Sequence, residues 1–348
     1  APPPPRPPPG PPLQPPAPPS PPSLPSPPMA PPPPTAPPAQ PTAVADARFG
    51  CGYPGPHRAE PDSTDALEKA VDDSGVTCIR LAPVVYALLS KLFVRDGRML
   101  AIVADDGQAT LDGGGSVGPM LTSLRGADVV LSNLRLRNGN STGGTGWGGA
   151  ISVSGSTMVM HACTFDRNRA RYGGAVVQWQ GMMEMHACAF DRNHAEAYAG
   201  AFLVQYGTVK MHACTFDGNR APWGGAVEND RATMEMHSCT FVGNRAQFGG
   251  AVEAWRATTM EMHACAFDRN HAEQQGGAVW NQDGPMKMHA CAFDRNHAEQ
   301  VGGAVYNDVY DNTYGNVYDS TMAVHGCNFT NCSAEVLLLS RSASSLRR

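Results

Sequence analysis

From residue 145 onward, apolar and polar side chains alternate with a period of two inside short segments. In residues 183–190, Met-Glu-Met alternates in this way, and after a break at His186-Ala187 the segment Cys-Ala-Phe alternates again. Period-two alternation is typical of a strand with one buried face. We therefore expect two short strands joined by a bend. A Gly-Gly-Ala-Val step follows in most copies and predicts a third strand.

This pattern recurs as an internal repeat built on Met-His-Ala-Cys-x-Phe-Asp-x-Asn. Successive cysteines of the repeat are 25, 26, 25, 26, 26 and 36 residues apart. Such a unit is too short for a helix-pair repeat, and the Leu-x-x-Leu-x-Leu frame of leucine-rich repeats is absent. Three short strands and three turns per unit predict one rung of a parallel β-helix.

Stacked rungs place equivalent residues one strand spacing apart, ~4.8 Å, so the repeat predicts ladders of identical side chains. We expect Phe, Cys and Met to point inward, Asn to occupy a turn where its amide bonds from rung to rung, and a mixed Glu/Lys series to point outward. The ladders are Phe165, Phe190, Phe216, Phe241, Phe267, Phe293 and Phe329; Cys163, Cys188, Cys214, Cys239, Cys265, Cys291 and Cys327; Met160, Met185, Met211, Met236, Met262 and Met288; Asn168, Asn193, Asn219, Asn244, Asn270 and Asn296; and Glu184, Lys210, Glu235, Glu261 and Lys287.

The Phe-x-x-Asn and Gly-Gly-Ala-[Val/Ile] pair, as in 165–168 and 173–176, resembles the repeat of the polymorphic outer membrane proteins. Those proteins belong to the right-handed β-helix, pectin-lyase-like superfamily. The resemblance covers roughly residues 145–335 and implies a right-handed parallel β-helix, about 25 residues per rung. It carries little information about activity.

Proline divides the chain, because 25 of its 32 prolines lie in residues 1–43. A segment of this composition has no apolar periodicity and favours extended polyproline II. Its Ser-Pro and Pro-Pro runs resemble the hydroxyproline-rich stalks of wall glycoproteins. The predicted organisation is a Pro-rich disordered arm at 1–44, a β-helix at 45–336 (cap 51–75, divergent rungs 76–144, regular repeats 145–336) and a tail at 337–348.

A short helix is expected at 62–75, ahead of the repeats. A capping residue in Asp-Ser-Thr-Asp precedes an apolar stripe, and Gly75 ends it. Such a helix would plug the open end of the β-helix, where a bare first rung leaves an unpaired edge. Residues 77–81, 109–114 and 129–136 read as strands.

The charge and hydropathy of the chain limit the kinds of partner and the cellular location that we expect. The net charge is −5 without a basic block, which argues against nucleic acid. No apolar run approaches the ~18–20 residues of a membrane helix. The chain begins at Ala1 without Met, so we expect a processed chain or a fragment. Together with the Pro-rich arm, these features favour a secreted or cell-surface protein.

The repeated His-x-Cys pair has the composition of a metal site. The bend between the strands should send His outward and Cys inward, so we expect a surface His ladder and buried thiols, with metal binding as the alternative. If the compartment is oxidising, Cys51 with Cys78 and Cys327 with Cys332 are the expected disulfides.

Acidic residues follow the Gly-Gly-Ala-Val step. Glu228, Asp230 and Glu253 are expected to face outward together, and paired carboxylates can perform glycoside chemistry. Stacked repeats also create such pairs automatically, and the superfamily's hydrolase motifs Asn-Thr-Asp and Gly-His-Gly are absent. The same outward placement is expected for Asn281, Asp283, Asn307 and Asp308.

Five aromatic residues occur on the same stretch of successive rungs. Exposed on a sheet, they would suit sugar stacking or protein contact, and the alternative is local packing under turns. They are Trp179, Tyr206, Trp255, Trp280 and Tyr306.

The last repeat carries a longer loop rich in Asp, Asn and Tyr. Asp308, Asp311, Asn312 and Asp319 are candidates for Ca²⁺ binding. No other cofactor is expected.

We interpret the sequence as a noncatalytic extracellular or cell-surface β-helix with a structural or adhesive role, glycan binding included. The alternative is a polysaccharide lyase or glycoside hydrolase of the pectin-lyase-like superfamily. The expected partner is a polysaccharide, a glycoprotein surface or another protein.

Overall fold

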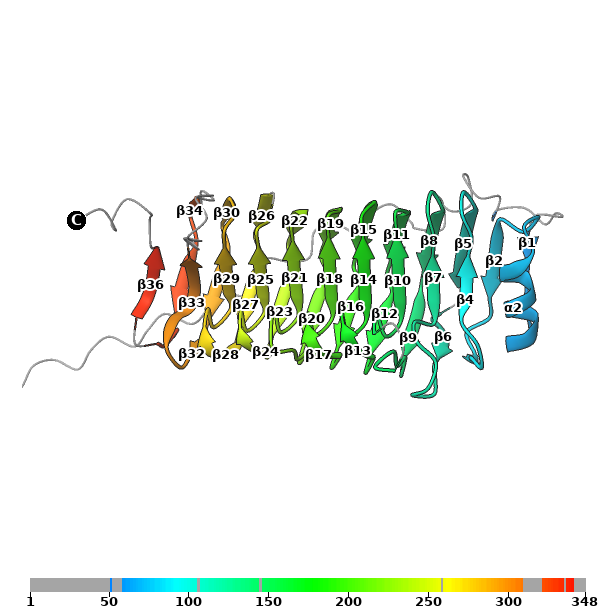
Figure 1. Ribbon diagram of the computed structural model, residues 1–348, viewed down its shortest axis with the longest axis horizontal. Helices are drawn as coiled ribbons and strands as arrows, with labels where there is room; N and C mark the ends of the chain where they lie inside the picture. Colours follow the sequence, from blue (N-terminus) through cyan, green and yellow to red (C-terminus); the bar gives the residue numbers. More distant parts are fainter. Residues whose placement is uncertain are drawn as a thin grey trace, which may run out of the picture. The chain divides into compact units, whose positions relative to one another are not determined.

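Parallel strands from successive turns stack into one β-helix, with a short helix at its N-terminal end (Figure 1). The all-β fold class is therefore confirmed. The computed structural model describes residues 51, 58–104, 107–143, 146–257, 259–308 and 321–334, and the backbone of 336–340. The predicted arm at 1–44 lies outside the described residues. Of the predicted tail, residues 341–348 also lie outside them, whereas 336–340 form a strand.

Sheet A is formed by the Met-x-Glu-Met-His segment of each repeat and by its counterparts in the earlier rungs. Among the described residues it holds 11 strands. They are β1 (Arg58–Ala59), β2 (Cys78–Leu81), β5 (Met99–Ala104), β8 (Asp128–Ser132), β11 (Thr157–His161), β15 (Met182–His186), β19 (Thr208–His212), β22 (Thr233–His237), β26 (Thr259–His263), β30 (Met286–His289) and β34 (Met322–His325).

Sheet B follows after a bend, at which Ala187 and its equivalents have positive φ, 52° at Ala187. This is the break expected at His186-Ala187. The sheet has ten strands in the described part of the chain. They are β3 (Val85–Ala87), β6 (Ala109–Asp112), β9 (Leu134–Arg137), β12 (Thr164–Asp166), β16 (Ala189–Asp191), β20 (Thr215–Asp217), β23 (Thr240–Val242), β27 (Ala266–Asp268), β31 (Ala292–Asp294) and β35 (Asn328–Thr330).

Sheet C follows the Gly-Gly-Ala step, as predicted. Its strands are β4 (Leu92–Val94), β7 (Leu121–Ser123), β10 (Ile151–Ser154), β14 (Val176–Trp179), β18 (Phe202–Gln205), β21 (Val227–Asp230), β25 (Val252–Trp255), β29 (Val279–Gln282), β33 (Val301–Asp308) and β36 (Val336–Ser340). A row of short strands between sheets B and C was not predicted: β13 (Arg169–Tyr172), β17 (His194–Tyr198), β24 (Arg245–Phe248), β28 (His271–Gln275) and β32 (His297–Ala298). The long strand β33 pairs in both rows.

The inward side chains of the three sheets meet in one core along the solenoid. Phe165 and Phe190 stack with ring centroids 4.7 Å apart, and the Phe ladder continues in this way to Phe329. The predicted Met and Cys ladders are buried beside it from Met160 to Cys291. Burying such a side chain contributes about 1.5–3 kcal/mol, so the repeated word supplies much of the stability.

The predicted Asn ladder is also confirmed. Asn193 donates from Nδ2 to the carbonyl oxygen of Phe165 at 3.0 Å, and its Oδ1 accepts the backbone N–H of Asn168 at 2.9 Å. The same bonds recur from Asn219 to Asn296. Each buried amide therefore satisfies backbone groups that the turn between sheet B and the short strands leaves unpaired.

The second glycine of each Gly-Gly pair is required by the rung spacing. A Cβ on Gly200 would lie 2.0 Å from the carbonyl oxygen of Gly225, and Gly225 has the same relation to Gly250. The first position only needs positive φ, and Ala199 adopts it with φ 56°. This explains why the divergent copy Ala199-Gly200-Ala201 changes the first glycine and keeps the second.

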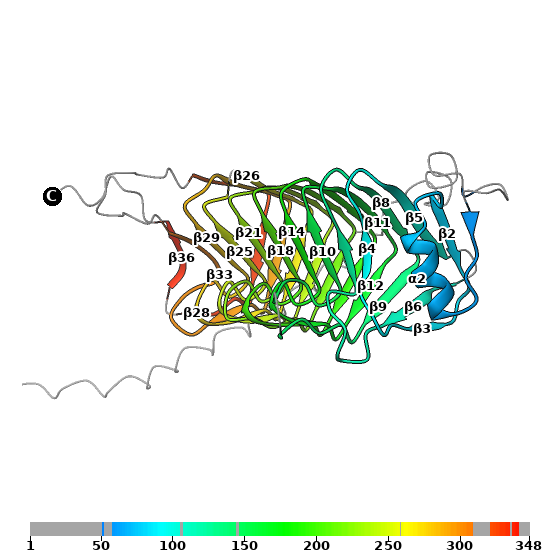
Figure 2. The same cartoon turned by 45° about the vertical axis from the view of Figure 1, so that its right-hand side comes forward.

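Helix α2 (Thr64–Asp72) covers the N-terminal end of the solenoid, beside β2 and β4 (Figure 2). The Ser63 hydroxyl accepts the Ala66 N–H at 3.3 Å, which confirms the expected cap. Leu67 is fully buried against the first rungs. The helix ends at Asp72, earlier than the predicted 75, and the Arg98 guanidinium donates to carbonyl oxygens at its C-terminal end.

The cysteines divide into one disulfide and eight free thiols. Cys51 and Cys78 form the predicted bridge. The prediction of a Cys327–Cys332 bridge is wrong, because both side chains are free. Strand β35 separates them: Cys327 continues the Cys ladder next to Cys291, and Cys332 takes the Asn position, where Asn296 Nδ2 lies 3.9 Å from its Sγ.

Candidate functional site

A row of aromatic side chains precedes the Gly-Gly turns and runs along the edge of sheet C. We call it the loop row. Neighbouring ring centroids are 4.4 to 6.4 Å apart. Its members are Trp147, Tyr172, Tyr198, Trp223 and Phe248. Sequence reasoning missed this row, although an aromatic residue directly before Gly-Gly or Ala-Gly in five copies was a readable signal.

The five aromatic residues singled out from the sequence do not form one row. Trp179 and Tyr206 are 39% and 44% exposed, whereas Trp280 and Tyr306 are each only 4% exposed. Trp255 is partly buried, and pairs in register with Asp230. Two of the five predicted aromatic residues, Trp280 and Tyr306, are therefore buried and not exposed on the sheet.

Trp280 is buried because the loop row covers it. Its ring lies 5.5 Å from that of Trp223 and 4.8 Å from that of Phe248. Local packing, the alternative to a binding role, describes this residue. Trp179, by contrast, meets Trp147 edge-on at 6.0 Å and remains exposed.

Glu228 and Glu253 are register partners on β21 and β25, so the structure brings these two candidates together. They face outward together as expected, but each is only 3% exposed and Asp230 only 2%. They point away from the core, on the face opposite Val227, but Tyr198 and Trp223 of the loop row close over them. Sequence alternation gives the face of a strand and not what covers that face.

Burial raises the pKa of the Glu228 carboxyl well above its ordinary value, and the neighbouring Glu253 and Asp230 raise it further. The pKa of Glu253 is raised well above its ordinary value by burial and then by Asp230. The raised pKa values shift both carboxyl groups toward their protonated form. One carboxyl oxygen of each, Oε2, has no hydrogen-bond partner among the described residues.

Asp230 differs from its two neighbours. Burial raises its pKa, while a 2.6 Å hydrogen bond from Gln205 and the charges of Arg231 and Arg256 oppose the rise. Arg231 also lies 3.8 Å from its carboxylate. The pKa of Asp230 is still raised overall, but these opposing partners distinguish it from Glu228 and Glu253, whose pKa values no such partner lowers.

These groups line a cavity of about 300 Å³ on the outer face of sheet C. Its walls are aromatic and its floor is the glutamate pair, with an arginine and an amide at the rim. The guanidinium groups of Arg231 and Arg256 lie over the Trp255 ring, 4.9 and 5.2 Å from its centroid, and hold that ring in place. The lining residues are Tyr198, Trp223, Glu228, Glu253, Trp255, Arg256 and Gln282. We call this cavity, together with the loop row beside it, the aromatic groove.

The second group of polar candidates does not as a whole have the outward placement that was expected. Its members are Asn281, Asp283, Asn307 and Asp308. Asn281 and Asn307 are fully buried and point inward, where Asn281 donates to Asn307 at 2.6 Å. Asp283 is 2% exposed in the bend after β29. These side chains are therefore structural and not a solvent-facing acidic cluster.

Of the four candidate Ca²⁺ ligands, Asp308 ends strand β33. Asp311, Asn312 and Asp319 lie outside the described residues. The calcium site stays a prediction.

The His ladder stacks along the end of sheet A with ring centroids 4.7 to 5.1 Å apart. The outward placement holds from His186 onward, where the rings are partly buried or exposed. His161 is the exception and is buried. Burial first, and the neighbouring His186 second, lower the pKa of His161 to about 4.

Comparison with known proteins locates the fold. No curated protein matches the chain. Residues 122–267 match the family model for the right handed beta helix region. The chain is thus a right-handed parallel β-helix, as the repeat predicted.

Solved structures with a similar arrangement include the catalytic domain of a GH87 alpha-1,3-glucanase with tetrasaccharides (9% identity, 83% of this chain and 69% of that chain, TM-score 0.36). Others are ORF18 of Geobacillus virus E2 (10%, 85% and 65%, 0.42) and a pectate lyase from Xanthomonas campestris (10%, 82% and 81%, 0.34). Similarity at this level carries no information about activity.

Within the described part of this β-helix, no helix has the length and apolar character needed to cross a membrane.

Proposed function

We propose that this right-handed β-helix is a noncatalytic module that binds glycan chains in the aromatic groove on sheet C. One observation carries the proposal: two buried, incompletely bonded carboxyl groups with raised pKa values form the floor of a cavity whose walls are aromatic. Buried polar atoms normally find partners, and a ligand hydroxyl would supply the missing one.

The chemistry of the groove suits a neutral sugar. A protonated carboxyl both donates and accepts a hydrogen bond, as a hydroxyl ligand requires. Aromatic faces such as that of Trp255 offer flat apolar surface to the C–H face of a sugar ring. Arg256 and Gln282 add further hydrogen-bond donors at the rim.

The groove also suits a polymer, because aromatic rings recur on successive rungs. The loop row advances one rung at a time from Trp147 to Phe248. An extended chain lying along the solenoid axis would meet a ring at each step. A compact ligand would need only the cavity between Tyr198 and Trp255.

We also propose a secreted or cell-surface location, with a glycan or glycoprotein surface as the partner. The Cys51–Cys78 disulfide favours an oxidising compartment. We further propose that the repeat is of the type found in the polymorphic outer membrane proteins. This assignment is supported by the Phe-x-x-Asn residues, which form the Phe and Asn ladders.

A glycan array with the full chain tests this function. We expect Trp255→Ala and Tyr198→Ala each to weaken binding about three- to tenfold, since one aromatic contact is worth about 0.5–1.5 kcal/mol. Phe93→Ala is the matched control, because Phe93 is a 39% exposed aromatic on sheet C outside the groove. Equal losses in all three variants would refute binding in the groove, as would the absence of any bound glycan.

The alternative, a polysaccharide lyase or glycoside hydrolase, is favoured by one observation. The pKa of Glu253 is raised well above its ordinary value beside the second carboxyl group of Asp230, and a carboxyl group with raised pKa paired with another carboxyl group is the arrangement used in glycoside hydrolysis. Product release from neutral glucans, polygalacturonate or alginate, with and without Ca²⁺, distinguishes the two. Turnover that Glu253→Gln abolishes would replace the noncatalytic proposal; binding without turnover supports it.

A further inference from the structure

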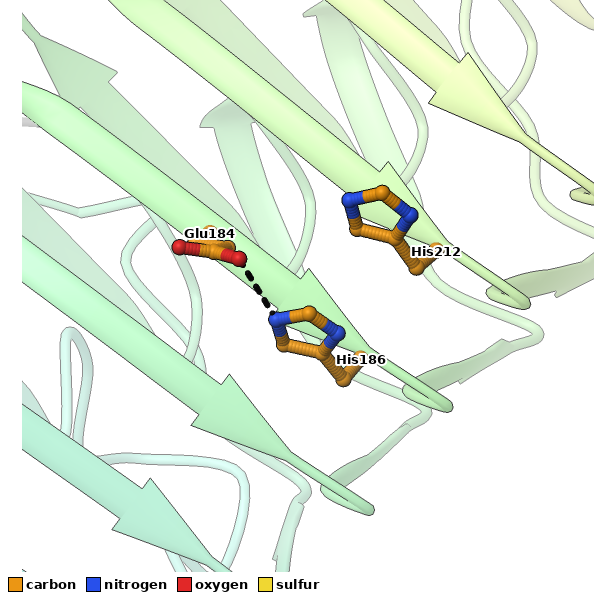
Figure 3. A group of neighbouring side chains, drawn as sticks. All are labelled: Glu184, His186 and His212. Atoms are coloured by element: carbon orange, nitrogen blue, oxygen red, sulfur yellow. Dashed lines mark hydrogen bonds and ion pairs between the residues drawn. The ribbon is translucent and has the colours of Figure 1, made fainter. Parts of the chain in front are cut away.

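Three metal-ligating side chains lie together on the outer face of sheet A, away from the aromatic groove. Glu184 Oε1 lies 2.8 Å from His186 Nε2, and the rings of His186 and His212 stack with centroids 5.0 Å apart (Figure 3). One potential ligand atom from each residue lies within 4.8 Å of those of the other two. Nothing in the proposed glycan function uses this cluster.

The arrangement recurs two rungs later. Glu235 Oε1 lies 2.7 Å from His237 Nε2, and the rings of His237 and His263 have centroids 4.7 Å apart. Their ligand atoms again lie within 4.8 Å of one another.

Strand geometry explains both clusters. Residues two apart on a strand share a face, which puts Glu184 beside His186. The register of β15 with β19 then pairs His186 with His212. The strands hold the three side chains together, so an ion would find most of the site already ordered.

In the second cluster, Lys210 Nζ lies 3.6 Å from Glu235 Oε2, which leaves Glu235 Oε1 beside His237. The other histidines of the ladder have no carboxylate oxygen placed in this way. On β19, the position equivalent to Glu184 is Lys210. Beside His289, the Glu261 carboxylate is bonded to Lys287 Nζ at 2.7 Å. Among the described residues, only the two clusters meet the distance condition.

We propose that each cluster binds one divalent transition-metal ion, zinc by preference, through two imidazole nitrogens and one carboxylate oxygen. Two His and one Glu are a ligand set of zinc sites with one open position. Zn–N and Zn–O bonds of ~2.0–2.2 Å put tetrahedral ligand atoms ~3.3 Å apart, so rotation of partly exposed side chains closes the site while the strands stay in place.

The cluster is open to solvent. The side chains of Glu184 and His186 are 46% and 16% exposed, which leaves an ion accessible to a water ligand.

Equilibrium dialysis of the full chain against Zn²⁺ tests the proposal, with the bound metal measured by mass spectrometry. We expect two ions per chain. His186→Gln should remove one, His237→Gln the other, and the double variant both. His289→Gln is the matched control, because it removes a stacked ladder histidine whose neighbouring carboxylate is occupied, and it should leave two ions bound.

Co²⁺ provides a second readout that a merely structural ladder would not give. We expect visible bands of a tetrahedral N/O site, without the near-ultraviolet thiolate band that binding to the free cysteines would produce. Thermal unfolding without metal verifies that each variant folds. The proposal is overturned if no ion binds at micromolar Zn²⁺, if His289→Gln loses as much metal as His186→Gln, or if the thiolate band appears.

Discussion

Glu228 stacks on Glu253 one rung away, and each carboxyl group is buried without a complete set of hydrogen bonds. Two adjacent acids avoid mutual repulsion in this position only by staying protonated. At neutral pH the buried pair lowers the free energy of unfolding, which is typical of functional rather than structural groups.

The pair predicts that stability depends on pH. Their folded-state pKa values are raised above the ordinary 4.5, so the folded state holds protons that the unfolded state has lost. The free energy of unfolding from these groups therefore falls as pH rises from about 4.5 toward the raised values. The variant Glu228→Gln/Glu253→Gln should unfold at a higher temperature than the unchanged protein at pH 7, with the difference shrinking toward pH 4. Calorimetry at both pH values checks this, and a difference independent of pH would contradict it.

The Asn ladder predicts a large loss of stability on removing one amide. Asn219 makes hydrogen bonds to Phe190 O, to the backbone of Asn193 and to the side chain of Asn244. Asn219→Ala leaves several buried groups unpaired, each at about 1–3 kcal/mol, so we expect a loss of about 2–4 kcal/mol by urea unfolding. Thr215→Ala, an exposed change on the same rung, should stay within about 0.5 kcal/mol. Similar losses in the two variants would contradict the role given to the ladder.

The Gly-Gly turn predicts an asymmetry between neighbouring positions. Gly200→Ala places a methyl group on the carbonyl oxygen of Gly225 and should destabilise the fold by more than the ~1–3 kcal/mol of ordinary overpacking. Ala199→Gly relieves an alanine held at φ 56° and should stabilise by up to about 1 kcal/mol. Chemical denaturation of both variants checks the pair. If Gly200→Ala is neutral, the rungs are more widely spaced at this turn than the structure has them.

The cysteine assignment predicts a thiol count. Under denaturing, non-reducing conditions we expect eight free thiols, because only Cys51 and Cys78 are bonded. Six would mean that Cys327 and Cys332 form a bridge. Reducing the disulfide, which closes a loop of 27 residues, should cost about 3 kcal/mol, and calorimetry with and without reductant measures it.

The regular repeats could be predicted in detail because each rung repeats the same sequence motif. Identical residues at one spacing have to stack, so the positions of Phe, Met, Cys and Asn followed directly. The rungs before residue 145 do not contain this motif. There the sequence missed β1, β3, β4, β5 and β7, and it read 129–136 as one strand where Asn133, at φ 56°, divides it into two.

The candidate site was only partly predictable, for a different physical reason. Alternation within β21 puts Glu228 away from the core, but whether it meets solvent depends on Tyr198 and Trp223, which belong to other segments of the chain. Trp223 likewise packs on Trp280, two rungs further along. Such contacts between loop and sheet have no fixed spacing, so the repeat could not reveal them.

The most direct test of the proposed function is affinity electrophoresis of the full chain in gels that contain soluble neutral polysaccharide, such as hydroxyethylcellulose or xylan. We predict that at least one polymer retards the protein, that Trp255→Ala and the variant Glu228→Ala/Glu253→Ala migrate faster than the unchanged protein in that gel, and that Phe93→Ala does not. Equal mobility of the protein and all these variants in every polymer would contradict a glycan-binding groove on sheet C.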